Sequence, residues 1–165
     1  MTDFGLRGGP MLDDTDTSVD NTSLGVAGRA RFILGYAART LERAIASPSQ
    51  DVELWRKQVE HDLGGLRQAL TEHIRITEGD DGLLSQILDQ APRLAAAVDV
   101  ILADHAELCE AVDAIQDILD GSREDVHEIR TQVIGVLSRL SAHRHRGADL
   151  VFDAYNVDIG GLSGE

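Results

Sequence analysis

The sequence predicts an all-α protein folded as an antiparallel, up-down four-helix bundle. Four segments repeat apolar residues in steps of three and four, the period of a helix with one buried face. The links between them are short, which makes consecutive helices antiparallel neighbours. Hydrophobic residues make up 42% of the 165 residues but aromatic ones only 4%, and there are three prolines, so we expect a helical core of Leu, Ile, Val and Ala.

The first predicted helix spans residues 24–46 and follows an arm, residues 1–22, that we expect to be disordered. Glycines and an acidic polar run leave the arm no apolar face to bury. The helix carries an apolar stripe, which three larger residues, Phe32, Ile33 and Tyr36, are expected to widen. The stripe consists of Ala30, Leu34, Ala37, Leu41 and Ile45.

The second predicted helix spans residues 48–78. Ser47 is expected to cap it, Pro48 suits its first position, and Gln50 completes a capping box. Its stripe is Val52, Trp55, Val59, Leu63, Leu66, Leu70, His73 and Thr77.

The third long helix is predicted over residues 92–120 and starts at Pro92. Before it, Gly79-Asp80-Asp81-Gly82 breaks the second helix, and a short helix is expected over residues 83–90. Its stripe is Leu94, Val98, Ile101, His105, Leu108, Val112, Ile115 and Leu119.

The fourth long helix is predicted over residues 123–156, with Ser122 as its cap and Asp125 three residues on. Gly121 ends the preceding helix. We expect the bundle to end at residue 161 and a polar tail, residues 162–165, to follow it. The stripe of this helix is Ile129, Val133, Val136, Leu140, His143, Gly147, Leu150 and Ala154.

Three of these stripes each place a histidine where a core residue belongs: His73, His105 and His143. Burying an imidazole is costly unless its nitrogens find partners, and a metal ion is a partner for one nitrogen of each ring. Imidazole suits iron, zinc and copper alike. His61 and His127, by contrast, are expected at the surface.

On these histidines and their surroundings, residues 24–161 resemble the hemerythrin-like (HHE cation-binding) family. That family surrounds two irons with a histidine on the first helix, His-x-x-x-Glu on the second, a histidine on the third and His-x-x-x-Glu on the fourth. The resemblance implies that His73, His105 and His143 are metal ligands assisted by Glu78. It also implies iron as cofactor and binding of oxygen or nitric oxide, iron handling or redox sensing. The matching segments are Glu72-His73-Ile74-Arg75-Ile76-Thr77-Glu78, Ala103-Asp104-His105-Ala106-Glu107-Leu108, Leu150-Val151-Phe152-Asp153-Ala154-Tyr155 and Asp158-Ile159-Gly160-Gly161.

The chain departs from the family pattern at its carboxylates. Thr77 stands at the second-helix carboxylate position, and Glu78 is displaced by one residue, about 100° around the helix. Gly147 stands at the fourth-helix position. One metal ion is therefore favoured over two irons.

Substitute ligands and a second function class stay open. The first helix has no histidine, and Tyr36 is its candidate ligand. His145 and Asp149 form a His-x-x-x-Asp pair, but His145 lies about 200° around the helix from His143. The alternative function is a metal-free bundle that acts as a protein-interaction module.

Charge and composition exclude other classes. The net charge of −14, from 29 acids and 15 bases, repels phosphate groups, so nucleic acid and anionic membranes are not expected partners. No apolar run reaches the roughly 18 residues that span a bilayer. With Cys109 as the single cysteine and no signal pattern, we expect a cytoplasmic protein. An enzyme ranks behind both readings because no nucleophile or phosphate-loop motif is present.

Overall fold

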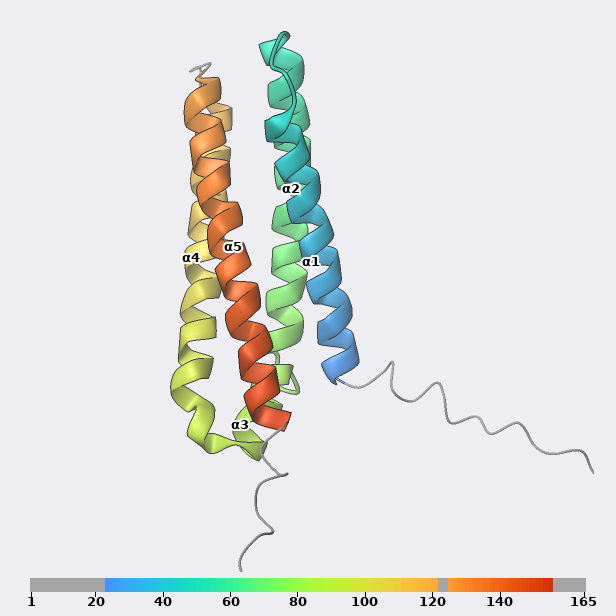
Figure 1. Cartoon of the computed structure of the whole chain (residues 1–165), viewed down its shortest axis with the longest axis vertical. Helices are drawn as coiled ribbons and strands as arrows, with labels where there is room; N and C mark the ends of the chain where they lie inside the picture. The colour runs from blue at the N-terminus through green and yellow to red at the C-terminus, as the bar shows by residue number, and fades with distance from the viewer. Residues whose placement is uncertain (1–22, 122–124, 156–165) are drawn as a thin grey trace, which may run out of the picture.

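The computed structural model describes residues 23–121 and 125–155, and in those ranges it is helical without strands. Four long helices lie side by side, and the chain turns back between α1 and α2 and again between α4 and α5 (Figure 1). None of the described helices has the length and apolar character to cross a membrane. The elements are α1 (Ser23–Ala46), α2 (Val52–Glu78), α3 (Leu83–Gln90), the 3-10 turn η2 (Pro92–Leu94), α4 (Ala95–Asp120) and α5 (Val126–Tyr155).

The long helices pack in a ring in which each has two neighbours. Helix α1 packs against α2, α2 against α4, α4 against α5 and α5 against α1. The short α3 contacts all four and covers one end of the ring (Figure 1). At the opposite end the indole nitrogen of Trp55 donates a hydrogen bond to the carbonyl of Ala44, 3.1 Å away, which ties α2 to the end of α1.

The apolar stripes are buried as predicted along most of α2, α4 and α5. Burial of each Leu, Ile or Val contributes about 1.5–3 kcal/mol to folding. The buried side chains form a large cluster along the bundle and a smaller one beside α3. On α4, His105 lies between Ile101 of the smaller cluster and Leu108 of the larger one. On α5, His143 lies between Leu140 and Leu150 in the same way, so a histidine layer separates the two clusters.

The predicted widening of the α1 stripe is wrong. Phe32, Ile33 and Tyr36 are 70%, 55% and 58% exposed. The face of α1 that packs against α2 and α5 is a narrow stripe that contains Ala30, Leu34 and Leu41. The three larger residues lie on the outward face.

The predicted start of the second helix is also wrong. Helix α2 begins at Val52, and the Asp51 carboxylate caps it by accepting a hydrogen bond from the Leu54 amide at 3.0 Å. Ser47 instead ends α1, where its hydroxyl donates to the Arg43 carbonyl at 2.9 Å. An aspartate cap satisfies the same unpaired amides that the predicted serine cap would have satisfied.

Two further helix starts lie later than predicted. Pro92 opens the 3-10 turn rather than the α-helix, because the turn closes through a hydrogen bond over three residues, from the Leu94 amide to the Ala91 carbonyl at 2.9 Å. At α5 the Asp125 carboxylate accepts from the Glu128 amide at 3.0 Å, so Asp125 caps a helix that begins at Val126. The predicted cap Ser122, the predicted first helical residue 123, the arm 1–22 and residues 156–165 lie outside the described residues.

Candidate metal site

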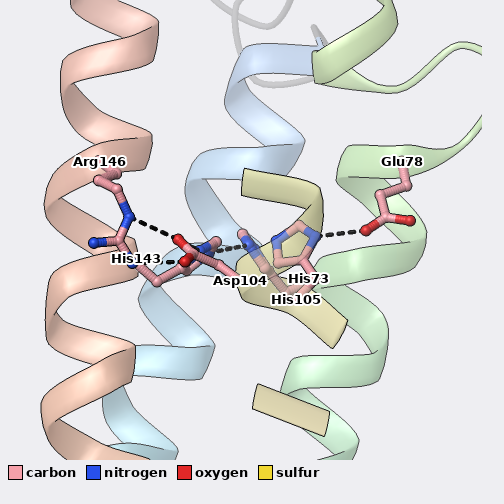
Figure 2. Close-up of polar contacts among 6 residues, drawn as sticks. All are labelled: His73, Glu78, Asp104, His105, His143 and Arg146. Carbon is pink, nitrogen blue, oxygen red and sulfur yellow. Dashed lines mark hydrogen bonds and ion pairs between the residues drawn. The ribbon is translucent and has the colours of Figure 1, made fainter. Parts of the chain in front are cut away.

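Three helices bring three histidines to one layer of the bundle. His73 comes from α2, His105 from α4 and His143 from α5, and their exposed fractions are 6%, 2% and 3%. One ring nitrogen of each lies within 4.8 Å of the others. The ring centroids are 4.7–5.5 Å apart, and Figure 2 shows the rings side by side. Among the described residues, these are the ones whose donor atoms group as a metal site would require.

The spacing of two donor nitrogens matches a metal site. The Nε2 atoms of His73 and His143 are 3.3 Å apart. Two nitrogens bonded to a tetrahedral ion at about 2.0–2.1 Å are separated by about 3.3 Å. The same spacing also permits a hydrogen bond between two neutral imidazoles, so the geometry accommodates the layer with and without an ion.

Carboxylates fix the orientation of two of the rings. The Nδ1 of His105 lies 2.6 Å from Oε1 of Glu78, and the Nδ1 of His143 lies 3.3 Å from Oδ2 of Asp104 (Figure 2). A carboxylate accepts hydrogen bonds, so each Nδ1 carries the proton and each Nε2 keeps its lone pair. Metal-binding histidines in proteins have this arrangement, in which the second nitrogen donates to a carboxylate.

Arg146 holds the Asp104 carboxylate in place. Its Nε and one terminal nitrogen donate to the two carboxylate oxygens at 2.8 and 2.6 Å. The side chain of Asp104 is only 13% exposed, so this paired contact orders the acid that faces His143.

Two buried nitrogens have no hydrogen-bond partner among the described residues: Nε2 of His105 and Nδ1 of His73. An unsatisfied buried polar atom costs about 1–3 kcal/mol. Because the Nδ1 of His105 donates to Glu78, the Nε2 of the same ring carries a lone pair and no proton. A metal ion in the layer would satisfy it.

Burial keeps the imidazoles of His73 and His143 neutral. It lowers the pKa of His73 to about 3, with further lowering by the neighbouring His105, His143 and Arg31. The pKa of His143 is also lowered, mainly by burial and then by His105, although Asp104 acts in the opposite direction. Neutral imidazole is the form that binds metal ions.

The other predicted ligands lie outside this layer or at its edge. Tyr36 is exposed on α1, and His145 and Asp149 are exposed on α5. The Glu78 side chain, 34% exposed, contacts His105 from outside the group of rings. Thr77 is buried, and its hydroxyl donates to the His73 carbonyl at 2.9 Å.

Sequence reasoning missed Asp104 and Arg146 as parts of the site. Asp104 directly precedes His105, and Arg146 lies three residues after His143, on the same side of the helix. These neighbours were the available signal. The contact itself joins residues 42 positions apart and depends on how α4 packs against α5. His61 and His127 are exposed, as expected.

A small cavity adjoins the layer. Apolar side chains of α1, α3, α4 and α5 form most of its wall, and the other residues that border it are Arg31, His73, Thr77, His143, Arg144 and Gly147. Its volume is about 30 Å³, where about 10–15 Å³ is enough for one water molecule. A molecule of two or three heavy atoms therefore fits beside the imidazoles.

Comparison of the chain with protein-family models, with curated proteins and with solved structures finds no match. The functional interpretation therefore depends on the geometry of the histidine layer and on the residues around it.

Proposed function

We propose that this protein is a metal-binding module with an antiparallel, hemerythrin-like bundle, and that His73, His105 and His143 hold one transition-metal ion. The observation that carries the proposal is the convergence of three buried imidazoles, two of which are oriented by carboxylates on Nδ1. The unpartnered Nε2 of His105 supports it, because a native core rarely leaves such an atom unsatisfied. The family resemblance favours iron, although the donor set also suits zinc or copper.

The proposed role is binding of a small diatomic ligand or redox sensing in the cytoplasm. Iron would supply reversible binding of oxygen or nitric oxide, or a change of oxidation state. The chain's own contribution is to hold three neutral ligands, to keep bulk water out by burial, and to offer the cavity beside His73 and His143 as an apolar approach. Three protein ligands leave coordination positions for an exogenous molecule.

Elemental analysis of untagged protein, with an absorption spectrum of the same sample, tests the proposal. We expect about one metal ion per chain, lost in His143→Leu and kept in the control His61→Leu, whose histidine is exposed. About two irons with oxo-bridge absorption bands would contradict the single-ion site. No metal after anaerobic loading with iron, and none after loading with zinc or copper, would contradict metal binding altogether.

The second candidate is a metal-free bundle that binds a protein partner, and the exposed face of α1 favours it. Phe32, Ile33 and Tyr36 lie within one and a half turns of that helix, and each is more than half exposed. Contiguous exposed apolar side chains are a common mark of interaction surfaces. In this case the protein stays metal-free after loading, and Phe32→Ser with Tyr36→Ser abolishes partner binding without changing the thermal midpoint.

A further inference from the structure

His73 differs from the other two histidines of the layer in its hydrogen-bond partners. The Nδ1 atoms of the other two rings each donate to a carboxylate, from Glu78 and Asp104 respectively. The His73 ring instead contacts His143, whose Nε2 lies 3.3 Å from Nε2 of His73 (Figure 2). In the part of the chain that the structure describes, the buried Nδ1 of His73 has no hydrogen-bond partner. The three rings therefore do not have equivalent surroundings.

The contact between His73 and His143 determines which nitrogen of each ring carries the proton. Burial keeps both rings neutral, and a neutral imidazole carries one proton. The proton of His143 is on Nδ1, where Asp104 accepts it, so the Nε2 of His143 acts as an acceptor. The Nε2 of His73 is therefore the donor of the 3.3 Å contact, because two lone pairs would otherwise face each other. Without a metal ion, His73 is protonated on Nε2 and His143 on Nδ1.

The two unpartnered nitrogens of the layer agree with this assignment. With its proton on Nε2, His73 keeps a lone pair on Nδ1, and His105 keeps a lone pair on Nε2. Both unpartnered atoms are then acceptors, and a buried acceptor without a donor is less rare in proteins than a buried N–H without an acceptor. The opposite tautomer of His73 would bury such an N–H and would also lose the hydrogen bond to His143.

We propose, on the basis of the metal-binding function above, that His73 is the exchangeable ligand of this site and that without an ion its Nε2–H bonds to His143 in the place of the metal. The lone pairs on Nε2 of His105 and His143 are available to an ion without any change in proton position. His73 offers a lone pair on Nε2 only after its hydrogen bond to His143 is broken. A metal ion therefore meets two ready ligands and one ligand that must exchange.

The exchange keeps the His73 ring neutral but leaves one donor unsatisfied. The Nε2–H bond breaks and its proton passes to water, Nδ1 takes up a proton from water, and the Nε2 lone pair forms the bond to the metal. The Nδ1 of His73 then carries a hydrogen for which the described residues provide no acceptor. In the other two ligands a carboxylate accepts from the same nitrogen. His73 is therefore the most weakly held of the three ligands.

The ring tautomers of the full-length, chelator-treated protein test the metal-free state. Long-range ¹⁵N–¹H correlation spectra distinguish a ring protonated on Nδ1 from one protonated on Nε2. We expect His73 in the Nε2–H form and both His105 and His143 in the Nδ1–H form. Asp104→Leu should leave His73 and His143 as mixtures of tautomers, whereas the control Asp99→Leu, an exposed acid on the same helix, should change neither ring. A His73 protonated on Nδ1 in the unaltered protein would overturn the proposal.

Zinc, which is diamagnetic and suits imidazole donors, tests the exchange with the same spectra. On loading, we expect His73 to change to the Nδ1–H form while the other two rings keep theirs. In competition with a chromophoric chelator, His73→Leu should lose about tenfold less zinc affinity than His143→Leu, the equilibrium equivalent of one unsatisfied buried donor.

The outcomes separate this inference from the proposed function. Zinc binding with an unchanged His73 tautomer, or with equal losses in His73→Leu and His143→Leu, would contradict the exchange alone. The expected metal-free tautomers without binding of zinc, iron or copper would contradict the proposed function and, with it, the ligand role of His73.

Discussion

Lowering the pH from 7 to 5 should destabilise the metal-free protein through His73. Its pKa is about 3 in the folded state, against about 6.5 for an unperturbed histidine. As the pH falls below about 6.5, His73 binds a proton in the unfolded chain but stays neutral in the folded chain. The free energy of unfolding therefore decreases as the pH drops from the unfolded-state pKa of about 6.5 toward the folded-state pKa of about 3. For one such group the loss from pH 7 to pH 5 is about 2 kcal/mol. In a chain of this size that corresponds to a lower thermal midpoint by about 4–8 °C.

The measurement compares the pH dependence of the free energy of unfolding between the unaltered protein and a variant. The 29 acidic residues also respond to pH, and less mutual repulsion at pH 5 acts in the stabilising direction. Urea unfolding at pH 7 and pH 5, in the presence of a chelator, should therefore be compared between the unaltered protein and His73→Leu. We expect the pH-dependent loss in free energy of unfolding to be about 2 kcal/mol smaller in the variant. In the control His61→Leu, whose histidine is exposed, it should not change.

Equal pH dependence in His73→Leu and the unaltered protein would refute the reasoning. It would mean that the folded state admits a proton at the layer, through water or a change of ring position. His143 remains in both proteins, and its pKa is lowered mainly by burial, so its contribution largely cancels in the comparison.

Three further predictions use the same layer and its surroundings. His105→Leu should raise the free energy of unfolding of the metal-free protein by about 1 kcal/mol, because the variant removes an unsatisfied buried nitrogen and loses only one hydrogen bond. In thermal unfolding, added metal should no longer stabilise this variant. Asp104→Asn should weaken metal affinity about 10- to 100-fold in competition with a chromophoric chelator, since it removes the charged acceptor that orients His143. Gly64→Ala and Gly65→Ala, in open space on α2, should each stabilise the fold by about 0.5–1 kcal/mol in urea unfolding without changing metal affinity.

Each of these has a contrary outcome. A metal-free His105→Leu that is strongly destabilised would show that its imidazole is satisfied in solution. Unchanged metal affinity in Asp104→Asn would show that Asp104 pairs with Arg146 but does not orient His143 for metal binding. Loss of stability in Gly64→Ala or Gly65→Ala would show that the added methyl group meets a surface packed against that face of α2.

The helices and the histidine layer could be predicted because both follow from the helical period alone. A histidine at a stripe position is directed at the core whatever the neighbouring helices are, so His73, His105 and His143 were all predicted to lie inside. The width of the α1 stripe could not be predicted in this way. It depends on which helices flank α1, and the exposed Phe32 and Ile33 have the same local pattern as buried residues.

The role of Glu78 could not be predicted from the helical period of the apolar residues. Counted from His73, Glu78 is one residue too far for a carboxylate on the same face, and by sequence this displacement weakens the site. The displacement of about 100° instead turns the side chain toward α4, where its oxygen lies 2.6 Å from Nδ1 of His105. Asp104 stands in the same relation to His143 from α4. Both acids therefore act on the outer nitrogens of the rings, and the centre of the layer contains neutral donors only. That arrangement favours one ion held by imidazoles over two ions bridged by carboxylates, which is why the proposed site is mononuclear.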